Sequence, residues 1–189
     1  MPKGKVVIIS GPSGAGKTTL VRRVLEASTL PLELSVSVTT RPARPGEVDG
    51  KDYHFWTDDA FQAGRANGSF LECFEVFGRG YWYGTLRSEV ADRMNAGRWV
   101  VLEIDVQGMQ EVLKAHPDAV TFFVRPDSLD TLRQRLEDRG TETPESLSRR
   151  LEVAAHEWNF RDKYHYEIIN NNLDEAVAQM IRILSESAE

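Results

Sequence analysis

Short runs of consecutive apolar residues are separated along the chain by segments whose apolar residues recur every three to four positions. The runs cover residues 5–10, 99–105, 119–124 and, more weakly, 166–169. A strand buried on both faces has no polar side, so these runs predict strands of a parallel sheet. The periodic segments predict helices at residues 18–27, 106–114, 128–138, 144–160 and 173–187. Strands that alternate with helices indicate an α/β fold, with a doubly wound parallel core sheet flanked by helices.

The middle of the chain, from about residue 35 to residue 97, breaks this alternation. It contains Arg-Pro-Ala-Arg-Pro-Gly at residues 41–46, followed by aromatic, strand-like pieces at 53–55, 70–74 and 81–83. Aromatic residues favour strands, and clusters of Pro and Gly favour loops. This stretch is therefore predicted to be a small mixed α+β insertion in the parallel core.

The composition is that of an ordinary globular protein with a surplus of acidic residues. The 189 residues are 41% hydrophobic and carry a net charge of −6, so the surface as a whole does not attract nucleic acid polymers or anionic membranes. No stretch reaches the roughly 18 apolar residues that span a bilayer, and we expect a cytoplasmic protein. The single cysteine, Cys73, excludes an internal disulfide. Arginines gather at residues 41–44 and 133–150, which favours a small phosphorylated ligand.

A phosphate-binding motif follows the first apolar run. Residues 11–18, Gly-Pro-Ser-Gly-Ala-Gly-Lys-Thr, fit the P-loop pattern G-x-x-x-x-G-K-[ST] between a predicted strand and a predicted helix. The glycines let backbone N–H groups and the helix N-terminus face phosphate oxygens. Lys17 is predicted to reach the β- and γ-phosphates of ATP, and the Thr18 hydroxyl to bind Mg²⁺. A glycine-rich turn without a ligand is the alternative. The predicted ATP contacts are Gly11, Pro12, Ser13, Gly14, Ala15, Gly16, Lys17, Thr18 and Thr19.

A carboxylate is expected at the end of a neighbouring buried strand, where it helps to hold the metal ion. Asp105 ends the apolar run 99–105, at the sheet edge where ligands of open α/β sheets bind. Asp105 is therefore predicted to be the second Mg²⁺ residue, and capping of the following helix is its alternative role. Glu103, two residues earlier, points to the same face of the strand.

A longer signature lies in the middle of the chain. Residues 35–47, Ser-Val-Ser-Val-Thr-Thr-Arg-Pro-Ala-Arg-Pro-Gly-Glu, and 50–55, Gly-Lys-Asp-Tyr-His-Phe, resemble the guanylate kinase family of P-loop nucleoside-monophosphate kinases. The resemblance continues through residues 70–72, 83–85, 102–108, 135–141 and 170–174. It implies a single domain over 1–189, with a core at about 1–34, 98–125 and 165–189, a GMP-binding insertion at 35–97 and a helical lid at 126–164.

The resemblance implies a phosphate site and a guanine site in or near the insertion. Arg41, Arg44, Tyr53 and Tyr83 would hold the phosphate of GMP, and Ser37, Glu72, Thr85 and Glu103 would surround the guanine. Guanidinium groups offer planar forks of donors to a phosphate, which fits the first role. A solvated loop for the arginines, aromatic packing for the tyrosines and an outward-facing Glu72 are the alternatives. Segment 78–84 is longer than in the family, which leaves Tyr81 as an alternative to Tyr83.

The resemblance also implies residues on the ATP side. Arg135, Arg139 and Arg150 would lie on or beside the lid over the ATP phosphates, and Asn170 near the adenine. The predicted catalytic set is Lys17, Arg41, Arg135, Arg139 and Arg150. Surface charge is the alternative for Arg135 and Arg150, and helix capping the alternative for Asn170.

The implied activity is Mg²⁺-dependent transfer of the terminal phosphoryl group of ATP to GMP, giving ADP and GDP in purine nucleotide metabolism. The expected partners are the small molecules GMP and ATP, and the expected protein is a monomer or homodimer. Two other functions are open, a phosphokinase acting on a ribose bisphosphate and a catalytically silent interaction module of the same fold. The guanine-facing residues argue against the first, and the intact P-loop argues against the second.

Overall fold

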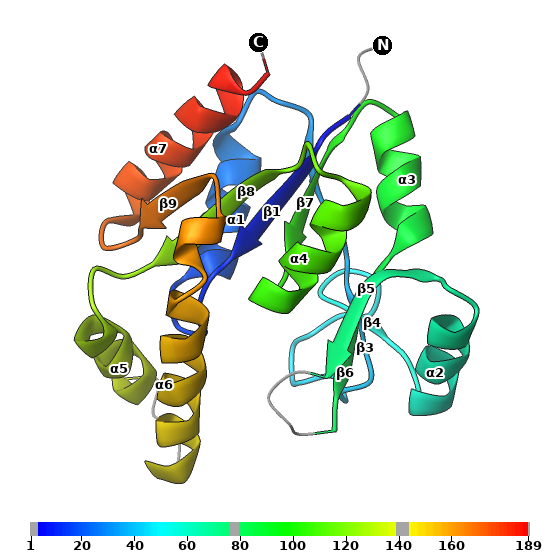
Figure 1. The fold of residues 1–189 in the computed structure, drawn as a ribbon, viewed down its shortest axis with the longest axis horizontal. Coiled ribbons are helices and arrows are strands. Elements are labelled where there is room, and N and C mark those ends of the chain that lie inside the picture. Colours follow the sequence, from blue (N-terminus) through cyan, green and yellow to red (C-terminus); the bar gives the residue numbers. More distant parts are fainter. Residues whose placement is uncertain (1–3, 76–79, 139–143, 189) are drawn as a thin grey trace. The chain divides into compact units, whose positions relative to one another are not determined.

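The computed structural model describes residues 4–75, 80–138 and 144–188 (Figure 1). Its elements are β1 (Val6–Ser10), α1 (Lys17–Ala27), β2 (Leu32–Leu34), β3 (Val38–Thr39), β4 (His54–Phe55), α2 (Asp58–Ala66), β5 (Phe70–Glu75), β6 (Trp82–Leu86), α3 (Arg87–Asn95), β7 (Trp99–Glu103), α4 (Val106–Ala115), β8 (Val120–Arg125), α5 (Leu129–Asp138), α6 (Pro144–Trp158), the 3₁₀ turn η1 (Arg161–Lys163), β9 (Tyr166–Ile169) and α7 (Leu173–Glu186).

Two sheets organise these strands. The five-stranded sheet has the order β2-β7-β1-β8-β9, and its β2/β7, β1/β8 and β8/β9 pairs are parallel. The four-stranded sheet has the order β4-β3-β6-β5, with antiparallel β3/β6 and β5/β6 pairs. Buried strands that alternate with helices give the parallel sheet, because each crossover needs a covering helix. The α/β class predicted from the sequence is confirmed.

The chain folds into two compact units. The first comprises Met1–Val6, Leu32–Leu102 and Gln107–Ala119, and the second comprises Val7–Pro31, Glu103–Val106 and Val120–Glu189.

The first unit has a small aromatic core under its four-stranded sheet. Val38, Phe61 and Phe70 are buried there, and Trp56, Cys73, Trp82 and Leu86 pack against them. The Phe61 and Phe70 rings stack at 4.4 Å between centroids. Gly64 sits inside α2 because a Cβ there would meet the Trp56 ring at 3.1 Å. This packing fixes β5 and β6, which carry several of the predicted site residues.

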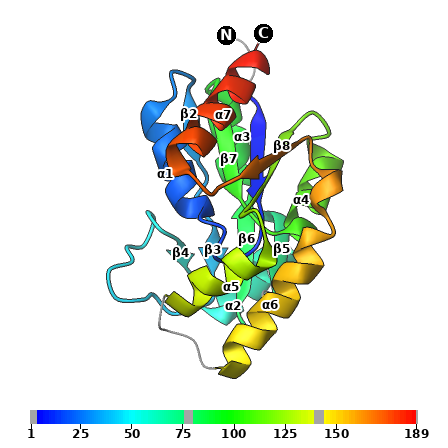
Figure 2. The ribbon, with the colours of Figure 1, turned by 90° about the vertical axis from the view of Figure 1, so that its left-hand side faces the viewer.

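The second unit is built on the parallel strands β1, β8 and β9. Every residue of β1 is buried, and Ile9 pairs with Phe122 while Val124 pairs with Ile168. Helices α1 and α7 pack against each other, as do α5 and α6 (Figure 2). Because β1 ends at Ser10 and α1 begins at Lys17, the P-loop is the connection between the buried strand β1 and the first helix.

The structure corrects the predicted elements at several points. Strand β7 ends at Glu103 rather than at residue 105, so that Asp105 lies in the turn before α4. Helices α2 and α3 and strand β3 were not predicted within the insertion of residues 35–97, and strand β2, just before it, was not predicted either. α2 and α3 have nine residues each, and α3 (Arg-Ser-Glu-Val-Ala-Asp-Arg-Met-Asn) buries only Val90 and Met94, which is too short an apolar pattern to predict a helix.

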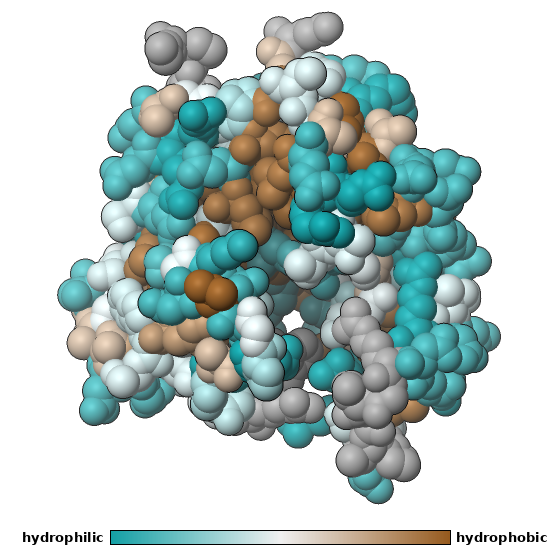
Figure 3. Space-filling view, turned by 180° about the vertical axis from the view of Figure 1, so that it is seen from behind, coloured by the Kyte–Doolittle hydropathy of each residue, from teal (hydrophilic) through white to brown (hydrophobic). Residues whose placement is uncertain are grey.

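The surface agrees with the acidic, polar composition. On the face drawn in Figure 3, hydrophilic residues cover much of the surface, and hydrophobic residues show between them. Within the described ranges, each helix is too short or too polar to cross a membrane.

Candidate functional site

Glycines shape the P-loop of the second unit. Gly11, Gly14 and Gly16 have φ angles of 143°, 92° and 84°, a region that side chains disfavour. A Cβ on Gly11 would lie 1.9 Å from the Val124 carbonyl oxygen, so the loop packs directly on β8. Helix α1 begins at Lys17 without an acidic residue in its first turn. The positive end of the helix dipole therefore faces the loop, and no carboxylate in that turn neutralises it. This arrangement favours the binding of an anion.

The two polar residues that end the motif point in different directions. The Lys17 ammonium group donates to the carbonyl oxygens of Gly11 (2.7 Å) and Pro12 (3.1 Å), so that it lies across the loop. The Thr18 hydroxyl donates to Oε1 of Glu103 (2.9 Å). The structure thus places Glu103, predicted to be a guanine contact, beside the P-loop. Its contact with guanine stays a prediction.

Asn170 packs against the P-loop. Its side chain is buried, and Nδ2 donates to the Ala15 carbonyl oxygen (2.9 Å). Its own carbonyl oxygen accepts from Nη2 of Arg135 (2.8 Å), so this predicted lid arginine is anchored next to the loop. The alternative role of Asn170 as a helix cap is wrong, because the cap of α7 is Asn172, whose side chain accepts from the backbone N–H groups of residues 174 and 175.

Arg150 and Arg139 are the other two predicted lid arginines. Arg150 lies half-buried on α6. Arg139 falls outside the described residues. Their contacts with ATP stay predictions.

A buried carboxylate in the second unit was not predicted. Glu157 of α6 is only 7% exposed. Burial raises the pKa of its carboxyl to about 7, and although the charge of Lys17 opposes the rise, Asp105 adds to it. Burial likewise raises the pKa of the nearby Tyr164 hydroxyl. No sequence pattern singles out Glu157, because its burial depends on how α6 packs in the folded unit.

Arg41 forms the centre of a polar cluster in the first unit. It is only 8% exposed, and its guanidinium donates through Nη1 and Nη2 to the two carboxylate oxygens of Glu47 (3.0 and 2.9 Å). This contact lowers the pKa of the Glu47 carboxyl. Nε of Arg41 donates to the Tyr83 hydroxyl (3.2 Å), and its Cζ lies 5.4 Å from the centre of the Tyr53 ring. The predicted residues Arg41, Tyr53 and Tyr83 are therefore together.

Glu47 is the partner of this cluster that the sequence did not single out. It also accepts from the backbone N–H of Arg44 (2.7 Å), whose side chain is exposed on the same loop. These contacts favour Tyr83 over Tyr81, because Tyr83 touches Arg41 and Tyr53, whereas Tyr81 is a large exposed side chain. The role of Tyr83 in binding the phosphate stays a prediction.

A second pair of predicted residues faces each other on neighbouring strands. Glu72 of β5 is directly opposite Thr85 of β6. The Thr85 hydroxyl, fully buried, donates to Oε1 of Glu72 (2.6 Å). Tyr83 and Thr85 are two apart on β6 and so lie on one face of the sheet. Ser37 lies half-buried just before β3, and its carbonyl oxygen accepts from the His54 N–H (2.9 Å).

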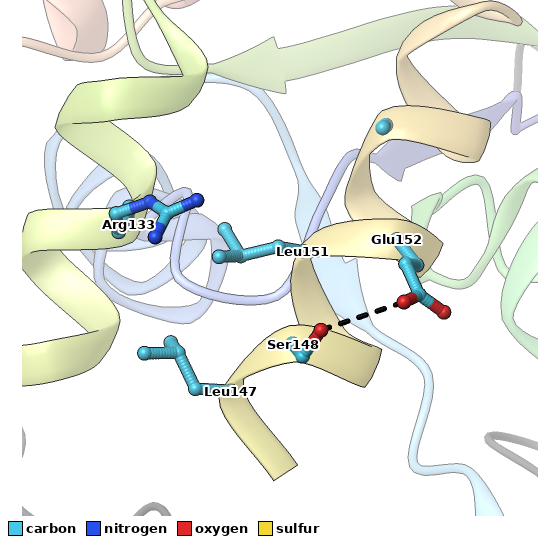
Figure 4. A pocket seen from close by; sticks show the side chains of 6 residues that line it. Arg133, Leu147, Ser148, Leu151 and Glu152 are labelled. Atoms are coloured by element: carbon cyan, nitrogen blue, oxygen red, sulfur yellow. Dashed lines mark hydrogen bonds between the residues drawn. The ribbon is translucent and has the colours of Figure 1, made fainter. Parts of the chain in front are cut away.

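Two cavities mark the described surface. The larger, of about 500 Å³, lies between α5 and α6, where Leu147 and Leu151 of α6 face Arg133 of α5 (Figure 4). It contains none of the predicted site residues. The smaller, of about 280 Å³, is lined by Glu72 together with Arg65, Phe70 and Cys73 of the first unit. Only the smaller cavity therefore coincides with a predicted binding residue.

Comparison with known proteins agrees with this arrangement. The guanylate kinase family model matches residues 3–187. The guanylate kinase of Rhodopirellula baltica is 51% identical over 182 residues, which is 96% of this chain and 87% of the relative, and that of Rubrobacter xylanophilus is 43% identical, covering 97% and 95%. The crystal structure of guanylate kinase from Anaplasma phagocytophilum superposes with a TM-score of 0.81 at 31% identity, covering 100% of this chain and 89% of the other. This chain belongs to the guanylate kinase family.

Proposed function

We propose that this chain transfers the terminal phosphoryl group of ATP to GMP, giving ADP and GDP. The observation that carries the proposal is the arrangement on β5 and β6. Glu72 and Thr85 form a carboxylate–hydroxyl pair, and Tyr83, on the same face of β6 as Thr85, contacts Arg41. Positions two apart on a strand are separated by about 7 Å, which suits two ends of one nucleotide, a base and a phosphate.

The base would be selected by hydrogen-bond chemistry. Guanine carries two neighbouring donors, N1–H and the exocyclic amine, and both can donate to one carboxylate. Adenine has an acceptor at N1 and no amine at C2, so it would offer no donor to the half-buried Glu72 carboxylate. Thr85 keeps one oxygen of Glu72 oriented by its hydrogen bond of 2.6 Å. Ser37, able to donate to guanine O6, would add to the preference.

The phosphate would be held by Arg41, Arg44, Tyr53 and Tyr83. Glu47 holds the guanidinium of Arg41 through both Nη groups, so a phosphate would have to replace part of this contact when it binds. A phosphate monoester has a second pKa near 6, so its oxygen is already an anionic nucleophile at neutral pH and needs no general base. The protein has to orient the two nucleotides and neutralise their charge.

On the ATP side, the P-loop would wrap the phosphates with its N–H groups, and Lys17 would exchange its two carbonyl partners for phosphate oxygens. Arg135, held by the Asn170 carbonyl oxygen next to the loop, would add a further positive charge. Arg139, Arg150 and the adenine contact of Asn170 complete the proposed ATP site.

The residues beside Thr18 fit Mg²⁺. The Thr18 hydroxyl lies 2.9 Å from the Glu103 carboxylate, and Asp105 follows two residues later, so oxygen ligands of the kind that Mg²⁺ prefers are close together. No cluster of three or more His, Cys, Asp and Glu side chains able to hold a metal occurs in the described ranges, and Mg²⁺ typically takes its remaining ligands from water and substrate phosphates. We therefore assign Thr18 and Asp105 to Mg²⁺, which would neutralise charge on the ATP phosphates.

A phosphotransfer assay with MgATP tests the proposal. Purified protein should form GDP from GMP and should leave AMP, CMP, UMP and ribose bisphosphates nearly untouched, and chelation of the metal should stop the reaction. Protein that binds GMP but does not turn over with MgATP would support the silent interaction module instead. The expectations of a cytoplasmic location, a role in purine metabolism and a monomeric or dimeric state stay predictions.

A further inference from the structure

A buried carboxylate on α3 holds the backbone next to Ser37. The Glu89 side chain is only 11% exposed, and its Oε1 accepts from the Val36 backbone N–H (3.2 Å) and from Nη2 of Arg93 (2.6 Å). Its Oε2 lies 3.7 Å from Nε2 of His54. Arg93 in turn donates through Nε to Glu33 on β2 (2.8 Å). Glu89 therefore joins α3 to the segment before β3 and to β4.

The segment of residues 35–37 is held at only a few points. The Ser35 N–H donates to the Val101 carbonyl oxygen (2.9 Å), and the Ser37 carbonyl oxygen accepts from the His54 N–H (2.9 Å). The N–H between them, that of Val36, donates to a side chain, Glu89. Strand β3 begins only at Val38 and has two residues, so the position of Ser37 depends on these contacts rather than on a long ladder.

We infer that Glu89 is a positioning residue for GMP: by accepting from the Val36 N–H, it fixes the backbone that presents Ser37 to the guanine. The inference rests on the proposed function, in which Ser37 binds the base. Glu89 acts through Val36 and touches neither nucleotide. The hydrogen bond from the Val36 N–H to Glu89 is charge-assisted and partly buried. If the carboxylate is removed, the N–H loses its acceptor at a place where water can replace it only in part.

Three variants separate the hydrogen bond from the charge. Glu89→Ala removes both. Glu89→Gln keeps the length and an acceptor oxygen but loses the charge, and Glu89→Asp keeps the charge but is one methylene too short to reach Val36. We expect Ala and Asp to raise the dissociation constant and the KM for GMP roughly tenfold. Gln should stay within about threefold of the wild type, because it still accepts from Val36. In all three, kcat and the KM for ATP should change little.

The matched control is Glu186→Ala on α7. Glu186 also pairs with an arginine four residues away, Arg182, but this pair lies on the exposed surface. The constants of this variant for both nucleotides should equal those of the wild type. Binding of GMP is measured by calorimetry and turnover by a coupled assay, with unfolding followed for each variant. A wild type that binds GMP without turnover would count against the proposed function and would still leave the Glu89 inference to be judged on binding.

Two results would overturn the inference. One is a folded Glu89→Ala protein whose affinity for GMP matches the wild type. The other is the reverse order of the conservative variants, with Asp near the wild type and Gln as weak as Ala, since this would make the charge of Glu89 the cause. If Glu89→Ala does not fold, the comparison of Asp with Gln decides alone.

Discussion

The Lys17 ammonium group lies across the P-loop on the carbonyl oxygens of Gly11 and Pro12. We expect Lys17→Ala to lower kcat by roughly 10²-fold or more, because the lysine meets charge that develops on the transferred group, whereas the melting temperature should change little. Lys114→Ala, which removes an exposed lysine paired with Glu111, is the control and should leave kcat unchanged. Steady-state kinetics with saturating GMP and ATP give both values. Near-normal turnover in folded Lys17→Ala would remove Lys17 from its proposed role.

At the residue scale, the sequence singled out the residues at the centre of each polar cluster but not the glutamates that hold them. Lys17, Thr18, Arg41, Tyr83, Glu72 and Thr85 are found in contacts that suit their predicted roles. Glu47, Glu89 and Glu157 were not singled out, because each acquires its partner or its burial only when the chain folds. A glutamate on a strand, loop or helix looks the same in a sequence whether it faces water or an arginine.

At the scale of elements, the turn from β1 into α1 depends on Gly16. Its φ is +84°, and a Cβ there would lie 2.6 Å from Nδ2 of the buried Asn170, which holds the Ala15 carbonyl oxygen. Gly16→Ala should therefore strain the backbone by about 1 kcal/mol, displace Asn170 and weaken ATP binding at least tenfold. Gly68→Ala is matched in φ (+76°) and meets no atom within 4 Å, so it should show the strain without the loss of ATP binding. Calorimetry with an ATP analogue distinguishes the two. Equal ATP affinities would contradict this account of the loop.

Helix α6 carries Glu157, whose folded-state pKa of about 7 lies above its ordinary value of 4.5. Its contribution to stability is therefore fully present below pH 4.5 and is lost as the pH rises through about 7. Glu157→Gln does not ionise, so the free energy of unfolding of the variant relative to the wild type should rise by about 3 kcal/mol between pH 4.5 and pH 8. Urea denaturation at several pH values measures the difference. The exposed Glu152→Gln on the same helix should show no such trend, and a flat Glu157→Gln difference would mean that the carboxyl titrates normally.

Apart from the three-residue edge strand β2, the strands of the parallel sheet and their helices could be predicted to within a few residues, since continuous burial and helical periodicity mark them in the sequence. The elements of the middle segment could not. Its strands β3 and β4 have two residues each, and α3 is polar on most sides, so their stability comes from tertiary packing rather than from local pattern.

At the scale of the whole molecule, the proposed GMP residues other than Glu103 lie in the first unit, and the proposed ATP and Mg²⁺ residues lie in the second. GMP alone should therefore slow hydrogen exchange most in β3, β5 and β6, and an ATP analogue alone should slow it most in the P-loop and α1. At a hundredfold excess over the dissociation constant, each ligand should stabilise the protein by about 2.7 kcal/mol. Protection by GMP that is confined to the P-loop would contradict this assignment.

The central claim is that the molecule is a phosphotransferase that selects guanine through Glu72, and the ratio of kcat/KM for GMP over AMP with MgATP tests it most directly. The wild type should favour GMP by roughly 10³ or more, because adenine leaves the Glu72 carboxylate without its donors. Glu72→Gln should lower that ratio by about 10², whereas Glu75→Gln, an exposed glutamate on the same strand, should keep it. A wild-type ratio near one, or a ratio that Glu72→Gln leaves unchanged, would contradict the account.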